Sequence, residues 1–383
     1  MDPTRRHLLT GLGGLAAAGA LGGWPMPSLA TTRAPKVVIV RFGGGVRRRE
    51  TIAPDTTFSP FLQRELIPRG LLYRDMVIEK LDGVKTSHAQ GTLYLLTGRY
   101  EDYQDIEGAW FGDRFEPTVP TLFEAARRQL GLPEHEVLVV NNENRVQDEF
   151  LTFSTHPDHG VAYRAGSLSR WRYRHHRLSA RVASGQATSA EARKLQELLD
   201  KDYRLDATTR AQSPALQSFW GRWLDYWGDT GLVEPRGDRG QTELALWALR
   251  HLRPRLMMIN YNDCDYVHWG LSHHYHRGIS VMDDGLRALV QHLDSDPFYR
   301  DDTLLVVVPD CGRDDNRFLP VPYQHHFGDR SAHEIFALFV GPGVRPGVVD
   351  RTVQQADVAP TVAGMLGLEL PHAEGTALTE VWA

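Results

Sequence analysis

Residues 36 to 45 read Lys-Val-Val-Ile-Val-Arg-Phe-Gly-Gly-Gly (KVVIVRFGGG). β-Branched residues concentrate in the first part of this stretch, and three glycines end it. The pattern is typical of a strand that is buried on both faces and leads into a tight loop. We therefore predict that the first strand of a sheet runs from Lys36 to Phe42.

Further apolar runs of similar length follow, and segments with helical periodicity separate them. Strands are predicted at 137–140, 256–260, 303–308 and 335–340, and helices at 120–130, 280–293 and 356–366. This alternation predicts the α/β class, with a mainly parallel central sheet flanked by helices. In such sheets binding sites form where the strands end, at their carboxyl edge.

Length and composition limit the possible classes of protein. The chain has 383 residues, of which 42% are hydrophobic, and its formal net charge is −5. These values exclude a disordered or collagen-like protein and give no general attraction for nucleic acid, so no nucleic-acid partner is expected. Residues from about 150 to 250 are rich in Arg, Trp and Tyr, and we interpret them as a helical insertion in one large domain, residues 31–383.

The N-terminal 30 residues have the pattern of an export signal. Arg5 and Arg6 precede a weakly apolar stretch rich in Gly and Ala, and Ser28 and Ala30 supply small residues for cleavage. This predicts a twin-arginine signal peptide over residues 1–30, with the twin-arginine translocase as a partner and a bacterial periplasmic or secreted location. A membrane helix is the weaker interpretation because the run is short and rich in glycine, so no stable membrane span is expected in the mature form.

Metal-ligand residue types gather at the ends of three predicted strands, where 8 of the 17 histidines fall between residues 268 and 333. The candidate ligands are Asp263, Asp265, His268, Asp310, Cys311 and either His325 or His326. Carboxylates and imidazoles at one sheet edge suit a divalent hydrolytic metal, zinc first, with manganese or calcium as alternatives. Adjacent residues of an extended segment point in opposite directions, and of the two neighbouring histidines we favour His326.

Some of these residues also have simpler interpretations. Asp263 is the nearest rival of Asp265 and has the residue type that caps a turn. Cys311 is a candidate ligand, a small buried residue, or a disulfide partner of Cys264 in an oxidising compartment.

Five short motifs, in order, resemble those of the alkaline phosphatase superfamily, which includes sulfatases and nucleotide pyrophosphatase/phosphodiesterases. They are Leu95-Leu96-Thr97-Gly98, the pair Asp265 and His268, Asp310-Cys311-Gly312, a histidine ahead of Gly341-Pro342-Gly343, and Asp357-Val358-Ala359-Pro360-Thr361. The match is scattered from residue 36 to about 375 and leaves the insertion uncovered. The resemblance implies an alkaline phosphatase-like fold and hydrolysis of an anionic phosphate or sulfate ester.

The chain departs from this resemblance at three positions. Glycines 43–45 stand where the superfamily has a metal-binding Asp, and Cys311 stands where it has a His. Near the expected nucleophile stands His88, preceded by Thr86 and Ser87. The site is therefore expected to be non-standard, with Ser87, His88, Thr86 or a metal-bound water as the attacking group.

Two accounts accommodate these departures. In the first, the chain is an exported metal-dependent hydrolase in which Arg47 and Arg313 hold the anionic oxygens of the ester. In the second, the fold is kept but hydrolysis is lost, and the protein is a catalytically inactive periplasmic binding or scaffold protein. The number of ligand types that remain clustered favours the enzyme.

Overall fold

Strand β1 (Lys36–Phe42) lies inside the central sheet, between β5 (Leu256–Asn260) and β6 (Thr303–Pro309), and is parallel to both. All seven of its residues are buried. The computed structural model of the chain describes residues 36–79, 84, 86–100, 117–141, 151–201, 212–228, 237–268, 271–315, 323–325 and 329–382. The predicted signal peptide lies outside these ranges.

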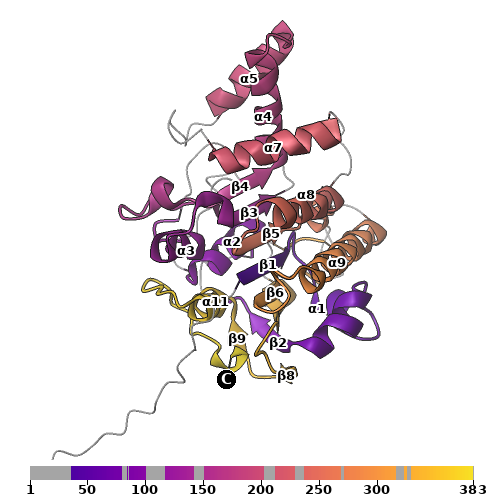
Figure 1. Ribbon diagram of the computed structural model, residues 1–383. Coiled ribbons are helices and arrows are strands. Elements are labelled where there is room, and N and C mark those ends of the chain that lie inside the picture. The colour runs from indigo at the N-terminus through magenta and orange to yellow at the C-terminus, as the bar shows by residue number, and fades with distance from the viewer. Residues whose placement is uncertain are drawn as a thin grey trace, which may run out of the picture. The chain divides into compact units, whose positions relative to one another are not determined.

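Within the described ranges, nine strands form the sheet, in the order β4-β3-β5-β1-β6-β7-β2-β8, with β9 paired to β2. The remaining strands are β2 (Leu71–Val77), β3 (Val137–Asn141), β4 (Gly166–Ser169), β7 (Glu334–Val340), β8 (Gly347–Val349) and β9 (Val353–Gln354). Only the pairings of β7 with β6 and β2 are antiparallel. The prediction of an α/β fold with a mainly parallel sheet is confirmed (Figure 1).

The two faces of the sheet are covered by different helices. Val37 and Ile39 of β1 belong to a hydrophobic cluster with α2 (His88–Thr97), α3 (Leu122–Leu130) and α11 (Val358–Leu366). Val38 and Val40 point to the other face, into a cluster with α7 (Pro214–Trp227), α8 (Gly237–His251) and α9 (Ser272–Ser295). Burial on both faces explains why β1 has a continuous rather than an alternating apolar sequence.

The predicted helices exist, with altered limits. Helix α3 begins after a capping box of Thr121 and Glu124 and ends at Gly131, whose φ of 63° is left-handed. Helix α9 is much longer than the predicted segment 280–293, and α11 is preceded by one tight turn, Gln355–Asp357.

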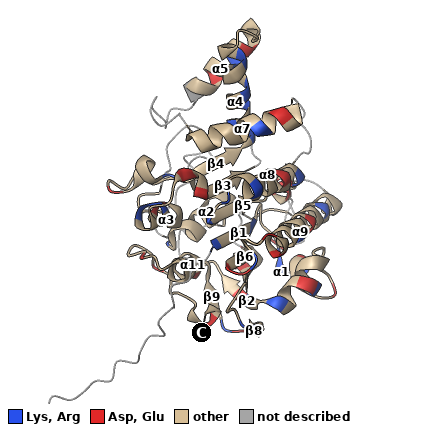
Figure 2. Ribbon diagram, viewed as in Figure 1, with Lys and Arg blue, Asp and Glu red and all other residues tan. Residues whose placement is uncertain are grey.

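The region predicted to be an insertion contains more than helices. It includes α4 (Arg170–Ala183), α5 (Ser189–Lys201), α7 and α8, and also β4, which is the last strand at one edge of the sheet. Three aromatic residues of α7 are packing residues, since Phe219, Trp220 and Trp223 are buried, whereas Tyr226 is exposed. Acidic and basic residues are interspersed along α7 and α9 (Figure 2). No helix in the described ranges combines the length and apolar character needed to cross a membrane.

Candidate functional site

The site is built at the carboxyl ends of β1, β5 and β6. The chain leaves β1 through Gly43–Gly45, leaves β5 into the short helix η9 (Asp263–Tyr266), and leaves β6 at Asp310. The start of α2 and the segment 323–325 lie against the same edge, because His88 contacts Asp310 and His325 contacts Asp265.

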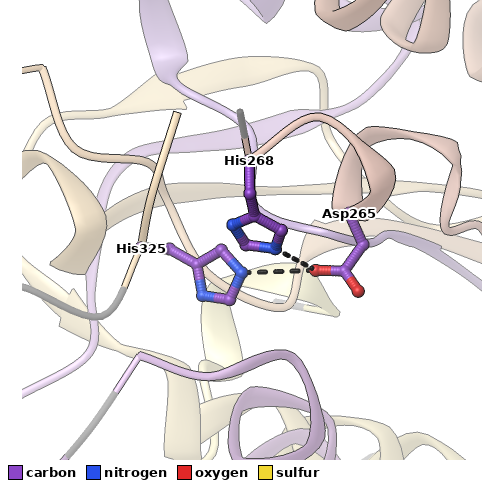
Figure 3. Close-up of side chains that lie close together, drawn as sticks. All are labelled: Asp265, His268 and His325. Carbon is purple, nitrogen blue, oxygen red and sulfur yellow. Dashed lines mark hydrogen bonds and ion pairs between the residues drawn. The ribbon is translucent and has the colours of Figure 1, made fainter. Parts of the chain in front are cut away.

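Asp265, His268 and His325 form the group best suited to hold a metal. Their ligand atoms all lie within 4.8 Å of one another, and no other described residues form such a group. Asp265 Oδ1 lies 3.2 Å from His268 Nε2 and 3.3 Å from His325 Nε2 (Figure 3). One carboxylate oxygen and two imidazole nitrogens match the three protein ligands of a catalytic zinc site.

The other nitrogen of each imidazole is held by a separate acceptor. His325 Nδ1 donates to the backbone oxygen of Thr86 at 2.8 Å, and His268 Nδ1 lies 3.0 Å from Gln324 Oε1. Because a carbonyl oxygen can only accept, Nδ1 of each ring carries a proton, and Nε2 faces Asp265, where it donates to the carboxylate or, once it has lost its proton, can bind a metal. Metal-binding histidines are commonly oriented by contacts of this kind.

Electrostatics keep Asp265 ionised. Burial opposes its charge, but hydrogen bonds from His268 and His325 outweigh burial and hold the pKa of this carboxyl well below its ordinary value. Burial lowers the pKa of His325, which favours the neutral imidazole that metals bind. A divalent cation that takes the place of the Nε2 protons would therefore be held by one anionic oxygen and two imidazole nitrogens.

Asp310 is held by a different set of contacts. Its carboxylate accepts hydrogen bonds from the backbone N–H groups of Gly44 at 3.1 Å, Gly45 at 3.2 Å and Cys311 at 2.8 Å. Gly44 and Gly45 both have positive φ, of 78° and 75°, and successive N–H groups in such turns form a cradle for anions. The cradle is filled by the protein's own carboxylate.

His88 and Arg41 complete the surroundings of Asp310. His88 Nδ1 contacts Asp310 Oδ2, and Arg41 donates from Nη2 to His88 Nε2 at 3.1 Å. Arg41 Nη1 also lies 3.7 Å from Asp310 Oδ2, and its guanidinium is buried. Burial raises the pKa of Asp310, but the nearby charges of His88 and Arg41 reverse this and lower it.

Comparison with known proteins was informative only at the level of structure. No protein-family model matches the chain, and no curated protein matches its sequence. Among solved structures, wild-type alkaline phosphatase PafA aligns with 92% of this chain and 100% of its own, at a TM-score of 0.57 and 12% identity. BT1596, a 2-O GAG sulfatase, aligns with 91% of this chain and 74% of its own, at a TM-score of 0.55 and 13% identity. Phosphonate monoester hydrolase of Agrobacterium radiobacter aligns with 91% of this chain and 77% of its own, at a TM-score of 0.52 and 15% identity.

The fold is alkaline phosphatase-like. The family resemblance drawn from the motifs is thus confirmed for the fold. Within this alkaline phosphatase-like fold, Gly44 stands at the exit of the first strand, and the Asp265 group lies beside it: a Cβ at Gly44 would be 2.2 Å from the backbone nitrogen of Asp265.

The structure separates the predicted ligands into three sets. Asp265 and His268 lie in the metal-ligand group, whereas Asp310 faces the glycine cradle. Asp263 and Asp238 of α8 each donate a backbone N–H to the carboxylate of the other, and Cys311 is buried outside the group. The favoured His326 lies outside the described residues.

The predicted catalytic hydroxyl is engaged in local structure. Ser87 is the N-cap of α2, where its Oγ accepts from Gln90 N at 3.2 Å and contacts Gln90 Oε1 at 2.9 Å. The Thr86 hydroxyl donates to the backbone oxygen of His325. Ser87 therefore fixes the start of α2, and Thr86, just before it, contacts His325.

The two predicted anion-binding arginines have protein partners. Arg47 pairs with Glu50 at 3.0 Å and with Asp315 at 3.3 Å. Arg313 is fully buried and donates to backbone carbonyl groups. Cys264 and Cys311, considered as a possible disulfide, are both free thiols.

Sequence reasoning missed Arg41 and gave His325 less weight than its neighbour His326. Arg41 carried a usable signal, because a charged residue inside a run buried on both faces requires a partner. The place of His325 in the metal-ligand group had no such signal, since it depends on the course of a loop that pairs with Thr86.

Proposed function

We propose that the protein is an exported, metal-dependent hydrolase of phosphate or sulfate esters with a non-standard active site. The observation that carries this proposal is the Asp265, His268 and His325 group, with its oriented imidazoles and ionised carboxylate. The alkaline phosphatase-like fold supports the ester class, because the solved neighbours named above are a phosphatase, a sulfatase and a phosphonate monoester hydrolase. Export rests on the twin-arginine pattern of residues 1–30, which predicts a periplasmic or secreted enzyme.

The donor set fits zinc, and manganese is the next candidate. A divalent ion held there would supply Lewis-acid polarisation of an ester oxygen. The protein's own part is to orient the imidazoles through Thr86 and Gln324 and to keep Asp265 ionised. Calcium is the poorest match, because it prefers six to eight oxygen ligands.

The test combines metal analysis with a substrate panel. The protein purified without chelator is expected to contain about one equivalent of metal and to hydrolyse at least one phosphate or sulfate ester in a panel of mono- and diesters. Asp265→Asn should lose both, because the amide cannot supply the anionic ligand. Metal-free protein that takes up no zinc or manganese on soaking would overturn the proposal.

The second candidate is a catalytically inactive binding or scaffold protein. It is favoured by two observations: the glycine cradle holds the protein's own Asp310, and the Ser87 hydroxyl is used as the cap of α2. Under this alternative, metal binds but no ester in the panel is turned over. Turnover that disappears in Asp265→Asn would decide for the enzyme.

A further inference from the structure

Arg313 lies at the point where the loops of the metal-ligand group meet. Its side chain is fully buried, and its position closely follows the β6 exit. Within the described part of the chain, every hydrogen bond of its guanidinium goes to a backbone carbonyl oxygen. These oxygens belong to Gly44, Gly45, Cys264, Val267 and Tyr323.

The five carbonyls come from three separate segments. Nε donates to Gly44 at 3.0 Å and to Gly45 at 2.9 Å, after β1. Nη2 donates to Cys264, and Nη1 donates to Val267 at 3.0 Å, on either side of Asp265. Nη1 also donates to Tyr323, two residues before His325.

A buried cation without a carboxylate partner is costly unless dipoles surround it. Here the carbonyl dipoles provide that environment, and the ring of Tyr275 adds a face 5.2 Å from the guanidinium carbon. The consequence is geometric, because each carbonyl that turns toward Arg313 fixes the backbone of its segment. The planar, five-donor guanidinium spans the three segments at once, which a single ammonium group cannot do.

We infer that Arg313 is a positioning residue that sets the spacing of Asp265 and His268 against His325 before any metal binds. This inference rests on the proposed function for its metal-binding consequence. It replaces the expectation that Arg313 holds the anionic oxygens of a substrate, since its donors are directed at the backbone. The inference itself concerns the backbone, so it can be tested with and without metal.

The first experiment titrates metal-free protein with Co²⁺ and records the visible d–d bands together with the affinity. Arg313→Lys keeps the positive charge but loses the planar guanidinium with its five donors. We expect the Co²⁺ affinity of this variant to fall by about 10- to 100-fold, as for other residues that orient metal ligands. Arg164→Lys is the matched control, because Arg164 is a buried arginine paired with Glu134 at 3.1 Å. The Co²⁺ affinity of Arg164→Lys is expected to match that of the wild type. If Arg313→Lys also binds Co²⁺ with wild-type affinity, the inference is overturned.

The second experiment measures amide hydrogen exchange of the Asp263–Val267 turn. In metal-free wild-type protein the amides of Asp265 and Val267, which donate to Asn262 and Cys264, are expected to be protected already. Adding Co²⁺ should change this protection little, whereas Arg313→Lys should lose it. Unprotected amides that become protected only with Co²⁺ would show that the metal, not Arg313, orders the turn.

These two experiments separate the inference from the proposed function. If wild-type protein binds no Co²⁺, the proposed function fails, and the exchange experiment still decides the role of Arg313. If Arg313→Lys does not fold, exchange in metal-free and Co²⁺-loaded wild-type protein still tests the inference, because amides that become protected only with Co²⁺ would overturn it.

Discussion

Asp265 and Asp310 show how two carboxylates at neighbouring strand ends acquire different roles. Asp265 accepts from two imidazoles, whereas Asp310 accepts from three backbone N–H groups and contacts His88. The difference comes from the glycines that follow β1, whose amides reach Asp310. Residue type alone would assign both carboxylates to a metal.

This difference predicts opposite effects of two matched substitutions. Asp310→Asn should retain Co²⁺ binding but destabilise the fold by about 3 kcal/mol, because it leaves the buried Arg41 without its anion and presents an amide donor to Gly44 and Gly45. Asp265→Asn should lose Co²⁺ binding. Cobalt titration and urea unfolding of both variants check this. Loss of Co²⁺ from Asp310→Asn as complete as from Asp265→Asn would make Asp310 a ligand.

At the scale of elements, the exit of β1 must pass close to the turn that carries Asp265. Gly44 has a φ of 78°, and a Cβ there would lie 2.2 Å from the Asp265 nitrogen. Gly131 at the end of α3 has a φ of 63° but no atom within 4 Å of an added Cβ. A side chain at either glycine would strain the backbone, but only a side chain at Gly44 would also collide with neighbouring atoms.

Alanine at each position gives a matched pair. Gly131→Ala should lose about 1–2 kcal/mol of stability from the left-handed backbone, measured by urea unfolding, and Gly44→Ala should lose more, because its Cβ also collides with Asp265. Only Gly44→Ala should also weaken Co²⁺ binding, by at least about 10-fold, because it displaces the Asp265 turn. Equal Co²⁺ affinity in both variants would contradict the close approach of β1 and η9.

A second element-scale contact joins α9 to the short helix η1 (Leu62–Leu66). Asp283 of α9 is buried and accepts from the backbone N–H groups of Phe61 at 2.9 Å and Leu62 at 2.8 Å. Burial raises the pKa of this carboxyl to about 6, despite those hydrogen bonds. A raised pKa favours the folded state while the group is protonated, and this contribution is lost as the pH rises through about 6.

The sign of this linkage predicts a pH effect on stability. Between pH 4.5 and pH 7 the contribution of Asp283 to the free energy of unfolding should fall by about 2 kcal/mol. Asp283→Asn should remove that part of the pH dependence, whereas Asp294→Asn, an exposed residue of the same helix, should keep it. Urea unfolding at both pH values measures the difference. An Asp283→Asn variant with the wild-type pH dependence would contradict the prediction.

The sequence predicted the strands that have continuous apolar runs and missed those that are short or interrupted by charged residues. β1 and β5 were located to the residue because their apolar runs are continuous. Leu71–Val77 contains Arg74 and Asp75 and has a register irregularity after Tyr73, and the edge strand Gly166–Ser169 has only one large apolar residue, Leu168. Such strands are defined by their neighbours rather than by their own composition.

The site was predictable to the same extent. Asp265 and His268 follow a strand that the sequence locates, so their place at the sheet edge could be inferred. The contact between His325 and Thr86, the direction of Asp310 and the carbonyl cluster around Arg313 join segments far apart in the chain. These contacts depend on how loops close against one another, which local patterns do not encode.

At the scale of the molecule, the metal-ligand group connects the turn after β5 with the segment 323–325, which precedes β7. A ligand that binds only the folded chain stabilises it by about 2.7 kcal/mol at a concentration of 100 times its Kd. A metal bound by this group would therefore act as a cross-link between distant parts of the sheet edge, and its removal should lower the stability of the whole fold. Asp265 supplies the shared oxygen, so the effect should depend on it.

Chelation tests this coupling. Removing metal from wild-type protein with a chelator should lower Tm by roughly 3 °C, and restoring zinc should recover it, because the unfolding entropy of a chain of this size makes Tm shift by only about 1.2 °C for each kcal/mol. Asp265→Asn should start from the lower Tm and respond to neither treatment. The measurement is calorimetry with and without chelator on both proteins. A chelator-induced drop of equal size in Asp265→Asn would mean that the stabilising ion binds elsewhere, and that the edge formed by β5 and residues 323–325 is held by protein contacts alone.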